Sequence, residues 1–239
     1  METMKQRNRS TGFRKSIVIV LFILCIAATV KPVAVHAAAD DGGWRVSKAS
    51  YSFLTSGQKK IFGKAVSGMT GVNYKPVALL ATQVVAGKNY VFLCQGTTVT
   101  IKPVNRWYVL TVYENLEKKV SLLSTKEIRL TDIKTEKEPK TRPLAGGLRI
   151  AAVKNKPSAL AETVRKVFQT AAKTYTDCKL KPVALLGKQV AAGTNYRILC
   201  FGKKHALANL FILDIYQNTK GECTITSCKP LMLEEYVGR

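Results

Sequence analysis

A duplicated tract constrains the fold of this 239-residue chain more than any other feature of its sequence. Residues 75–94 recur 106 positions later as residues 181–200, and fourteen of the twenty paired positions are identical. The flanking sequences match as well, with Gly-Gly pairs upstream and alternating apolar strands downstream. A repeat of this length predicts two similar domains rather than one large core. We expect independently folding domains at residues 40–133 and 144–239, with a charged linker at 134–143.

Each copy shows the same predicted order of elements, namely one helix followed by four strands. Apolar residues at helical spacing support the helices: Phe62, Ala65, Val66 and Met69 in the first copy, and Val164, Phe168, Ala171, Ala172 and Tyr175 in the second. The tracts that follow alternate with period two and are separated by Gly- or Asn-bearing turns. The fold class predicted is α+β, with each helix packed on a four-stranded antiparallel sheet.

The alternation along the strands also predicts which side chains are buried. Cys94 and Cys200 are expected to face inward as reduced thiols, because the first copy holds no partner for a disulfide. Thr111, Arg197 and Asp214 fall on the opposite face, which is expected to face solvent.

The first 39 residues resemble an export signal. Five basic residues precede an uninterrupted run of apolar and small residues at 16–30, and Ala37-Ala38-Ala39 offers a cleavage site. The expected location is therefore secreted or extracellular. An uncleaved membrane tether is the alternative, although fifteen residues fall short of the roughly 20 that a spanning helix needs.

The chain remaining after residue 39 is strongly basic, with 32 Lys and Arg against 14 Asp and Glu. This charge favours loose attraction to an anionic cell-envelope polymer. The basic residues are scattered rather than clustered with aromatics, so no specific nucleic-acid binding is expected.

Few residues suit catalysis or metal binding. One histidine, His205, remains after residue 39, and no His or carboxylate pair recurs between the copies, so we expect no enzyme activity and no catalytic residues. Cys223 and Cys228 alone make a poor metal pair, so no metal or other cofactor is expected. A disulfide among Cys178, Cys223 and Cys228 stays open.

The segment Gln83-Val84-Val85-Ala86-Gly87, followed by Asn89-Tyr90, resembles the first inhibitory hairpin of the cystatins, which inhibit papain-like cysteine proteases. Gln189-Val190-Ala191-Ala192-Gly193, followed by Asn195-Tyr196, repeats the pattern. The predicted element order is also that of the cystatin family, so the resemblance implies tandem cystatin-like domains with a papain-like protease as partner.

In cystatins, as the resemblance implies, a Gly-bearing trunk and two hairpins form a wedge that fills the protease cleft. The protease-binding residues implied in the first domain are Gly42, Gly43, Gln83, Val84, Val85, Ala86, Gly87, Asn115 and Leu116. Those implied in the second domain are Gly146, Gly147, Gln189, Val190, Ala191, Ala192, Gly193, Asn218 and Thr219.

One departure from the family pattern bears on potency. Cystatins usually carry a Pro-Trp pair on the second hairpin, whereas this chain has Asn115-Leu116 and Asn218-Thr219 there. The lost aromatic anchor implies weak inhibition. The alternative function is a non-inhibitory tandem binding module for a cell-envelope polymer or a host surface protein.

Overall fold

The computed structural model describes residues 42–47, 54–131, 133, 146–153, 160–204 and 207–237. The predicted signal peptide, the linker 134–143 and His205 lie outside these residues. Contacts group Gly42–Arg239 into one compact unit that contains both repeats. No helix among the described residues is long and apolar enough to cross a membrane.

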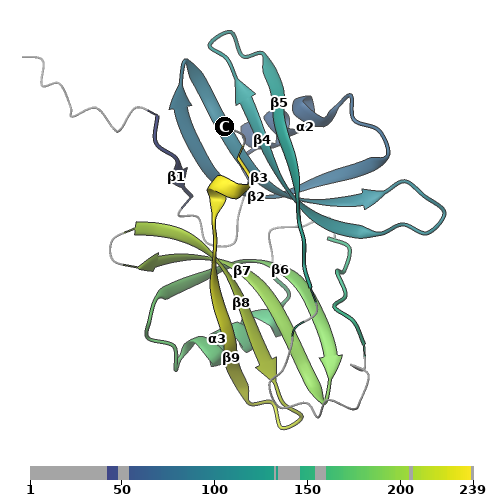
Figure 1. Ribbon diagram of the computed structural model, residues 1–239, viewed down its shortest axis with the longest axis vertical. Coiled ribbons are helices and arrows are strands. Elements are labelled where there is room, and N and C mark those ends of the chain that lie inside the picture. Colours follow the sequence, from purple (N-terminus) through teal and green to yellow (C-terminus); the bar gives the residue numbers. More distant parts are fainter. Residues whose placement is uncertain are drawn as a thin grey trace, which may run out of the picture. The chain divides into compact units, whose positions relative to one another are not determined.

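The first repeat forms a five-stranded antiparallel sheet in the order β1-β2-β3-β4-β5. One helix crosses a face of this sheet (Figure 1). The elements are β1 (Arg45–Val46), α2 (Ser56–Val66), β2 (Val72–Val85), β3 (Gly87–Thr98), β4 (Asn105–Glu114) and β5 (Val120–Ile128). The two-residue strand β1 was not predicted from the sequence, because so short a pairing leaves no periodicity to detect.

The second repeat forms a four-stranded antiparallel sheet in the order β6-β7-β8-β9. Its elements are α3 (Glu162–Ala172), β6 (Lys179–Ala191), β7 (Gly193–Lys204), β8 (Leu207–Gln217), β9 (Cys223–Leu231) and a final 3-10 turn, η2 (Leu233–Glu235). A single bridge between Arg149 and Lys188 stands where β1 pairs with β2 in the first repeat. The chain therefore has the predicted α+β class.

Both helices are shorter than their apolar periodicity suggested. The first begins at a capping box in which Thr55 and Gln58 exchange backbone and side-chain hydrogen bonds. It ends at Val66, before Met69, and Gly68 in the following turn disfavours further helix. The second helix ends at Ala172, before Tyr175.

Each helix covers one face of its own sheet. Phe62 of α2 packs edge-on against Phe92 of β3, with ring centroids 5.4 Å apart. Phe168 of α3 occupies the matching place above Ile198 and Cys200 of β7. Cys94 and Cys200 are fully buried free thiols, as predicted. Burial raises the pKa of both thiols well above the ordinary value.

The faces of the two sheets away from the helices pack into one hydrophobic cluster that both repeats share. Residues 90–96 of β3 are all buried, because alternate side chains enter the helix-side core and the shared cluster. The first repeat contributes Val77, Leu80, Val91, Leu93, Trp107 and Val109, and the second contributes Val183, Leu186, Leu199, Phe201, Leu210 and Leu231, among others.

Trp107 fixes the two sheets against each other. Its indole is 1% exposed, and its Nε1–H donates to the carbonyl oxygen of Leu186 on β6, 2.7 Å away. The side chain of Gln95 likewise binds the second repeat, since it donates to the Ala151 carbonyl (2.9 Å) and accepts from Val153 N–H (2.6 Å). These bonds satisfy polar groups that the shared cluster would otherwise bury unpaired.

The prediction that Thr111, Arg197 and Asp214 face solvent was wrong. Thr111 and Asp214 are 2% and 6% exposed. Arg197 makes a two-pronged ion pair with Asp214, at 2.7 and 2.8 Å, and donates to the Thr131 carbonyl of the first repeat. Polar residues at alternate positions predicted a solvent-exposed face. Here Arg197 pairs with Asp214 beside the first repeat, and Thr111 accepts a hydrogen bond from the Ser124 hydroxyl.

The shared cluster leads to an expectation opposite to that of independent folding. Fragments 40–133 and 144–239, expressed separately, should expose the apolar face that the intact chain buries. Each fragment is therefore expected to self-associate in size-exclusion chromatography and to enhance the fluorescence of a dye that binds apolar surface. The intact chain starting at Asp40 serves as the control. Two monomeric fragments that melt cooperatively without binding the dye would support the independent domains inferred from the repeat.

Candidate functional site

The β2–β3 hairpin of the first repeat turns at Ala86, with Val85 and Gly87 paired on either side. Gly87 has φ +130°, and a Cβ there would lie 2.4 Å from the Glu114 carbonyl oxygen and 2.8 Å from the Tyr113 ring. The Tyr113 hydroxyl donates to the Ala86 carbonyl. Glycine is required at this position because the hairpin lies directly against the end of β4.

Gln83 connects this hairpin to the Gly-Gly segment. Its Nε2 donates a hydrogen bond of 2.6 Å to the Gly42 carbonyl oxygen, and its Oε1 accepts one of 2.7 Å from Asn89 Nδ2. Gly42 has φ +103°, and both Gly42 and Gly43 are exposed. The amide side chain therefore holds the trunk beside the hairpin, although the two segments lie 41 residues apart.

The β4–β5 turn lies at the same end of the sheet. Asn115 closes it by accepting from Lys119 N–H through its Oδ1 (2.8 Å), and Lys118 takes a positive φ of 66°. Leu116 at this turn is 78% exposed. The contact of Gly87 with Glu114, the residue before Asn115, places the two turns next to each other.

Three chain segments thus meet at one end of the first sheet, and we call the surface they form the wedge surface. Val84 and Val85, 48% and 40% exposed, and Leu116 supply its apolar area. Exposed aliphatic side chains beside two turns and a glycine trunk can be desolvated by a partner's cleft at little entropic cost. The wedge surface comprises Gly42, Val84, Val85, Ala86 and Leu116.

The second repeat builds its hairpin in the same way. Gly193 has φ +134°, and a Cβ there would lie 2.5 Å from the Gln217 carbonyl oxygen. The Tyr216 hydroxyl donates to the Ala192 carbonyl. Exposed Gly146 and Gly147 run beside it, since a Cβ on Gly146 would meet the Val190 carbonyl oxygen at 3.1 Å.

The base and the tip of the second hairpin differ from those of the first. Gln189 is 1% exposed, and its Oε1 accepts a hydrogen bond of 2.9 Å from Ile133 N–H of the first repeat. The corresponding oxygen of Gln83 accepts from Asn89, while the Gln83 Nε2 holds the trunk at Gly42. At the tip, Val190 is 58% exposed, Ala191 is half-buried, and the adjoining turn carries polar Asn218 and Thr219. This end presents far less apolar area than the wedge surface.

Tyr90, near the wedge surface, has a raised pKa. Tyr90 is 8% exposed and donates from its hydroxyl to Glu114 Oε2 over 3.0 Å. Burial, and then the hydrogen bond to this carboxylate, raise the pKa of Tyr90 to about 12.

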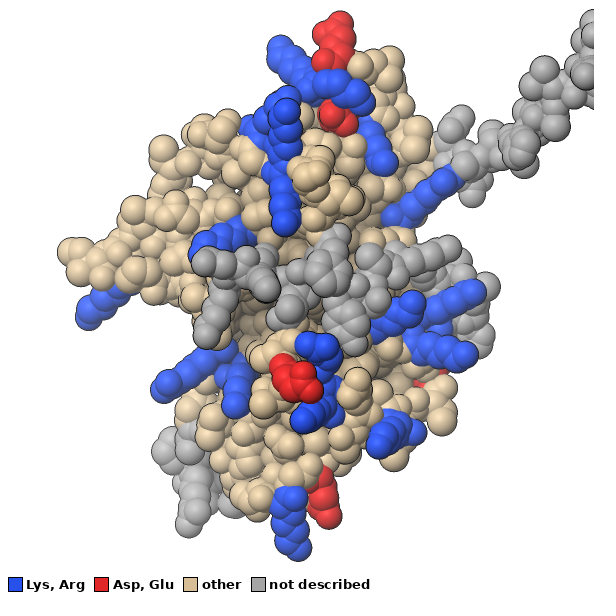
Figure 2. Space-filling model, turned by 180° about the vertical axis from the view of Figure 1, so that it is seen from behind, with Lys and Arg blue, Asp and Glu red and all other residues tan. Residues whose placement is uncertain are grey.

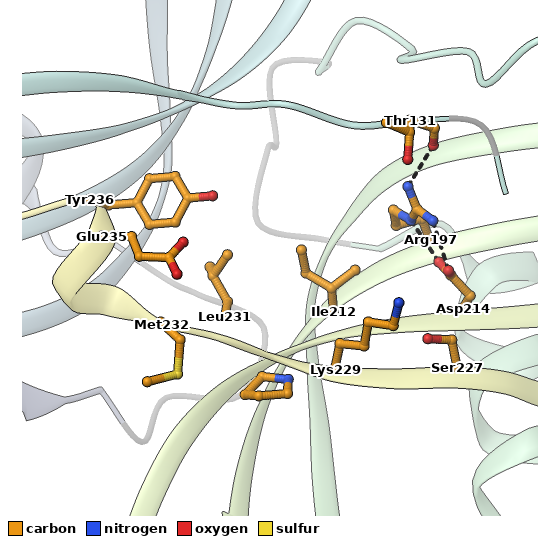
Figure 3. A pocket seen from close by; sticks show the side chains of 11 residues that line it. Thr131, Arg197, Ile212, Asp214, Ser227, Lys229, Leu231, Met232, Glu235 and Tyr236 are labelled. Atoms are coloured by element: carbon orange, nitrogen blue, oxygen red, sulfur yellow. Dashed lines mark hydrogen bonds and ion pairs between the residues drawn. The ribbon is translucent and has the colours of Figure 1, made fainter.

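A cavity of about 300 Å³ lies over β7, β8 and β9 of the second sheet, beside the final turn (Figure 3). Its most polar group, the Arg197 guanidinium, is already paired with Asp214 and with the Thr131 carbonyl. The remaining lining mixes apolar and charged side chains: Ile212, Ser227, Lys229, Pro230, Leu231, Met232, Glu235 and Tyr236.

No cluster of three or more His, Cys, Asp or Glu side chains suited to a metal ion occurs among the described residues. Cys223 and Cys228 are half-buried free thiols, and Cys178 is buried. The expectations of no enzyme activity, no metal and no cofactor stay predictions.

Comparisons with known proteins give little further guidance. No protein-family model and no curated protein matches the chain. One solved structure that matches is titled "Ntf2 like protein involved in plasmid conjugation"; it is 7% identical, with a TM-score of 0.20, over 76% of this chain and 91% of that one. At that TM-score the likeness carries no argument about fold or function.

Replacing Gly87 should destabilise the protein itself. Gly71 is the matched control, since it also has a positive φ (+82°) but nothing within 4 Å of an added Cβ. Gly71→Ala is expected to cost about 1–2 kcal/mol through backbone strain. Gly87→Ala should cost about 1–3 kcal/mol more, because it adds a clash with the Glu114 carbonyl. Urea unfolding of both variants measures the difference; equal losses would show that the hairpin can relax.

The Tyr90–Glu114 bond should make stability depend on alkaline pH. Because the folded-state pKa is raised from 10.0 to about 12, the neutral phenol stabilises the fold below pH 10, and this contribution is lost between pH 10 and 12. Tyr90→Phe should therefore melt below the parent at pH 8, and the gap should narrow as pH rises through this range. Thermal melts of both proteins across the range measure it, and a constant gap would exclude the linkage.

Proposed function

We propose that the chain is a secreted tandem cystatin-like protein whose first repeat inhibits papain-type cysteine proteases through the wedge surface. The observation that carries the proposal is the convergence of the Gly42 trunk, the Val84–Val85 hairpin and the Leu116 turn at one end of the sheet. These are the three segments that the cystatin resemblance assigns to inhibition.

The proposed mechanism uses no reacting group of the inhibitor. The two valines and Leu116 enter the protease cleft and exclude water from it, while exposed Gly42 and Gly43 allow the trunk to lie flat. Burial of a valine is worth about 1.5 kcal/mol, and no Trp reinforces it on the second hairpin. Inhibition should therefore be weak, with a constant of micromolar order.

Inhibition by the second repeat stays a weaker proposal. Val190 is its exposed apolar side chain at the hairpin, and Gln189 is engaged by Ile133. The trunk that leads to this hairpin is also held between the repeats, because Gln95 binds Ala151 and Val153. A trunk fixed in this way cannot adjust to a cleft as a free one can.

Titration of papain with the chain starting at Asp40 tests the proposal. Val84→Ser/Val85→Ser should weaken inhibition about tenfold or more, because both side chains are exposed in the free protein and buried in the complex. Asn115→Pro/Leu116→Trp should tighten it by adding the aromatic anchor. Val190→Ser is the matched control in the second repeat and should change inhibition little.

Thermal melts must show that all three variants remain folded. Gly87 is a poor test of inhibition, since its replacement disturbs the fold. If neither the folded parent nor the folded Pro-Trp variant inhibits papain, the proposal is refuted.

A non-inhibitory binding module is the second candidate function. It is favoured by the internal roles of the motif, since Gly87 and Gly193 each fit against the adjoining strand and Gln83 hydrogen-bonds within the chain. The fold alone would then preserve the motif. Lys and Arg spread over the face in Figure 2 with few acidic residues, which suits an anionic polymer. Salt-sensitive binding to polygalacturonate, without papain inhibition, would favour this candidate.

A further inference from the structure

The loop between β3 and β4 presents aliphatic side chains to solvent at the other end of the first sheet from the wedge surface. Val99, Ile101 and Val104 are 61%, 101% and 47% exposed, respectively. The loop projects beyond the strands it joins (Figures 1 and 2). We call residues 99–104 the apolar loop. Several large aliphatic side chains exposed together on a short segment are characteristic of an interaction site.

Internal hydrogen bonds hold the apolar loop in this open form. Val99 N–H donates to the Gly71 carbonyl, and Val104 N–H donates to Thr98 Oγ1, each at a donor–acceptor distance of 2.9 Å. The Thr100 hydroxyl donates to the Lys102 carbonyl at the same distance. These hydrogen bonds favour the open form, in which the aliphatic side chains stay exposed.

The sheet does not need these residues. The repeat offset falls from 106 before the apolar loop to 103 after it, so the corresponding connection of the second repeat is three residues shorter. The residues that correspond to the apolar loop are His205-Ala206-Leu207 in the sequence, and β7 and β8 still pair on either side of this connection. The shorter connection carries one large aliphatic residue, Leu207, whereas the apolar loop carries three.

Exposed basic side chains lie on the strand ends next to the apolar loop. Lys75, Lys102, Arg106 and Arg129 are all exposed at this end of the sheet. Glu127, which pairs with Arg106 at 3.0 Å, is the acidic residue among them. An aliphatic tip with exposed cations near its base matches a surface with an apolar interior and anionic head groups.

We propose that the apolar loop inserts into the outer layer of an anionic lipid membrane, with Lys102 and its neighbouring cations at the head groups. A protein partner is disfavoured, because a narrow loop cannot supply the roughly 800 Å² per side of a stable interface. It also lacks the Trp, Tyr and Arg anchors typical of such contacts at its tip. The inference is independent of protease inhibition.

Vesicle co-sedimentation tests this with the chain starting at Asp40, which contains the whole compact unit but not the apolar run of residues 16–30. The probes are vesicles of equal parts phosphatidylcholine and phosphatidylglycerol, and vesicles of phosphatidylcholine alone. The parent should bind the anionic vesicles. Val99→Ser/Ile101→Ser/Val104→Ser should partition about tenfold less, since its aliphatic area is lost while its charge is unchanged.

Val84→Ser/Val85→Ser is the matched control, because it removes exposed valines at the wedge surface and should bind lipid like the parent. The difference between the parent and the triple variant should persist in high salt, which screens only the charge contribution. Equal binding by the folded triple variant would overturn the proposal and leave charge alone as the cause. Failure of the parent to bind either vesicle would also overturn it and point to a protein partner for the apolar loop.

Discussion

The shared core between the two sheets is the constraint on which the rest of the structure depends. Each sheet has a helix on one face and the other repeat on the opposite face, so its central strands are buried on both sides. Trp107 bridges the two sheets through its hydrogen bond to the Leu186 carbonyl. With both faces covered, the turns at the sheet ends are the main places left for exposed apolar side chains. The wedge surface and the apolar loop are both such turns.

The segments that follow the last strand of each repeat reinforce this contact by crossing to the other repeat. After β5, Thr131 and Ile133 hydrogen-bond with Arg197 and Gln189. After β9, the carbonyls of Glu235 and Tyr236 accept from side chains of β5, namely Lys126 and Ser124. One crossing covers the base of the second hairpin, whereas Gln83 of the first hairpin binds its own trunk. Two nearly identical motifs therefore occur in different surroundings.

The sequence predicted the repeat, the helices, the strand order and the hairpin turns, because each leaves a local pattern. The sequence could not reveal what covers the second face of each sheet. Alternation of apolar and polar residues assigns side chains to one face or the other, but it does not show what packs against each face. Asp214 read as solvent-exposed for this reason. Paired irregularities in β2, between Pro76 and Ala78 and between Leu79 and Ala81, also escape detection. At these irregularities the side chains of Val77 and Leu80 point into the shared cluster. Strand β6 has the same two irregularities at the corresponding positions.

The identity of a motif is a weak guide to its function when the fold needs the same residues. Gly87 and Gly193 would clash if replaced, whether or not a protease ever approaches them. What separates the two hairpins is the exposed apolar area beside them, which the fold does not require. Val84, Val85 and Leu116 keep a large part of their apolar surface exposed, which is unfavourable relative to burial. Exposed aliphatic side chains are therefore better indicators of a binding surface than the glycines, and the same reasoning applies to Ile101 on the apolar loop.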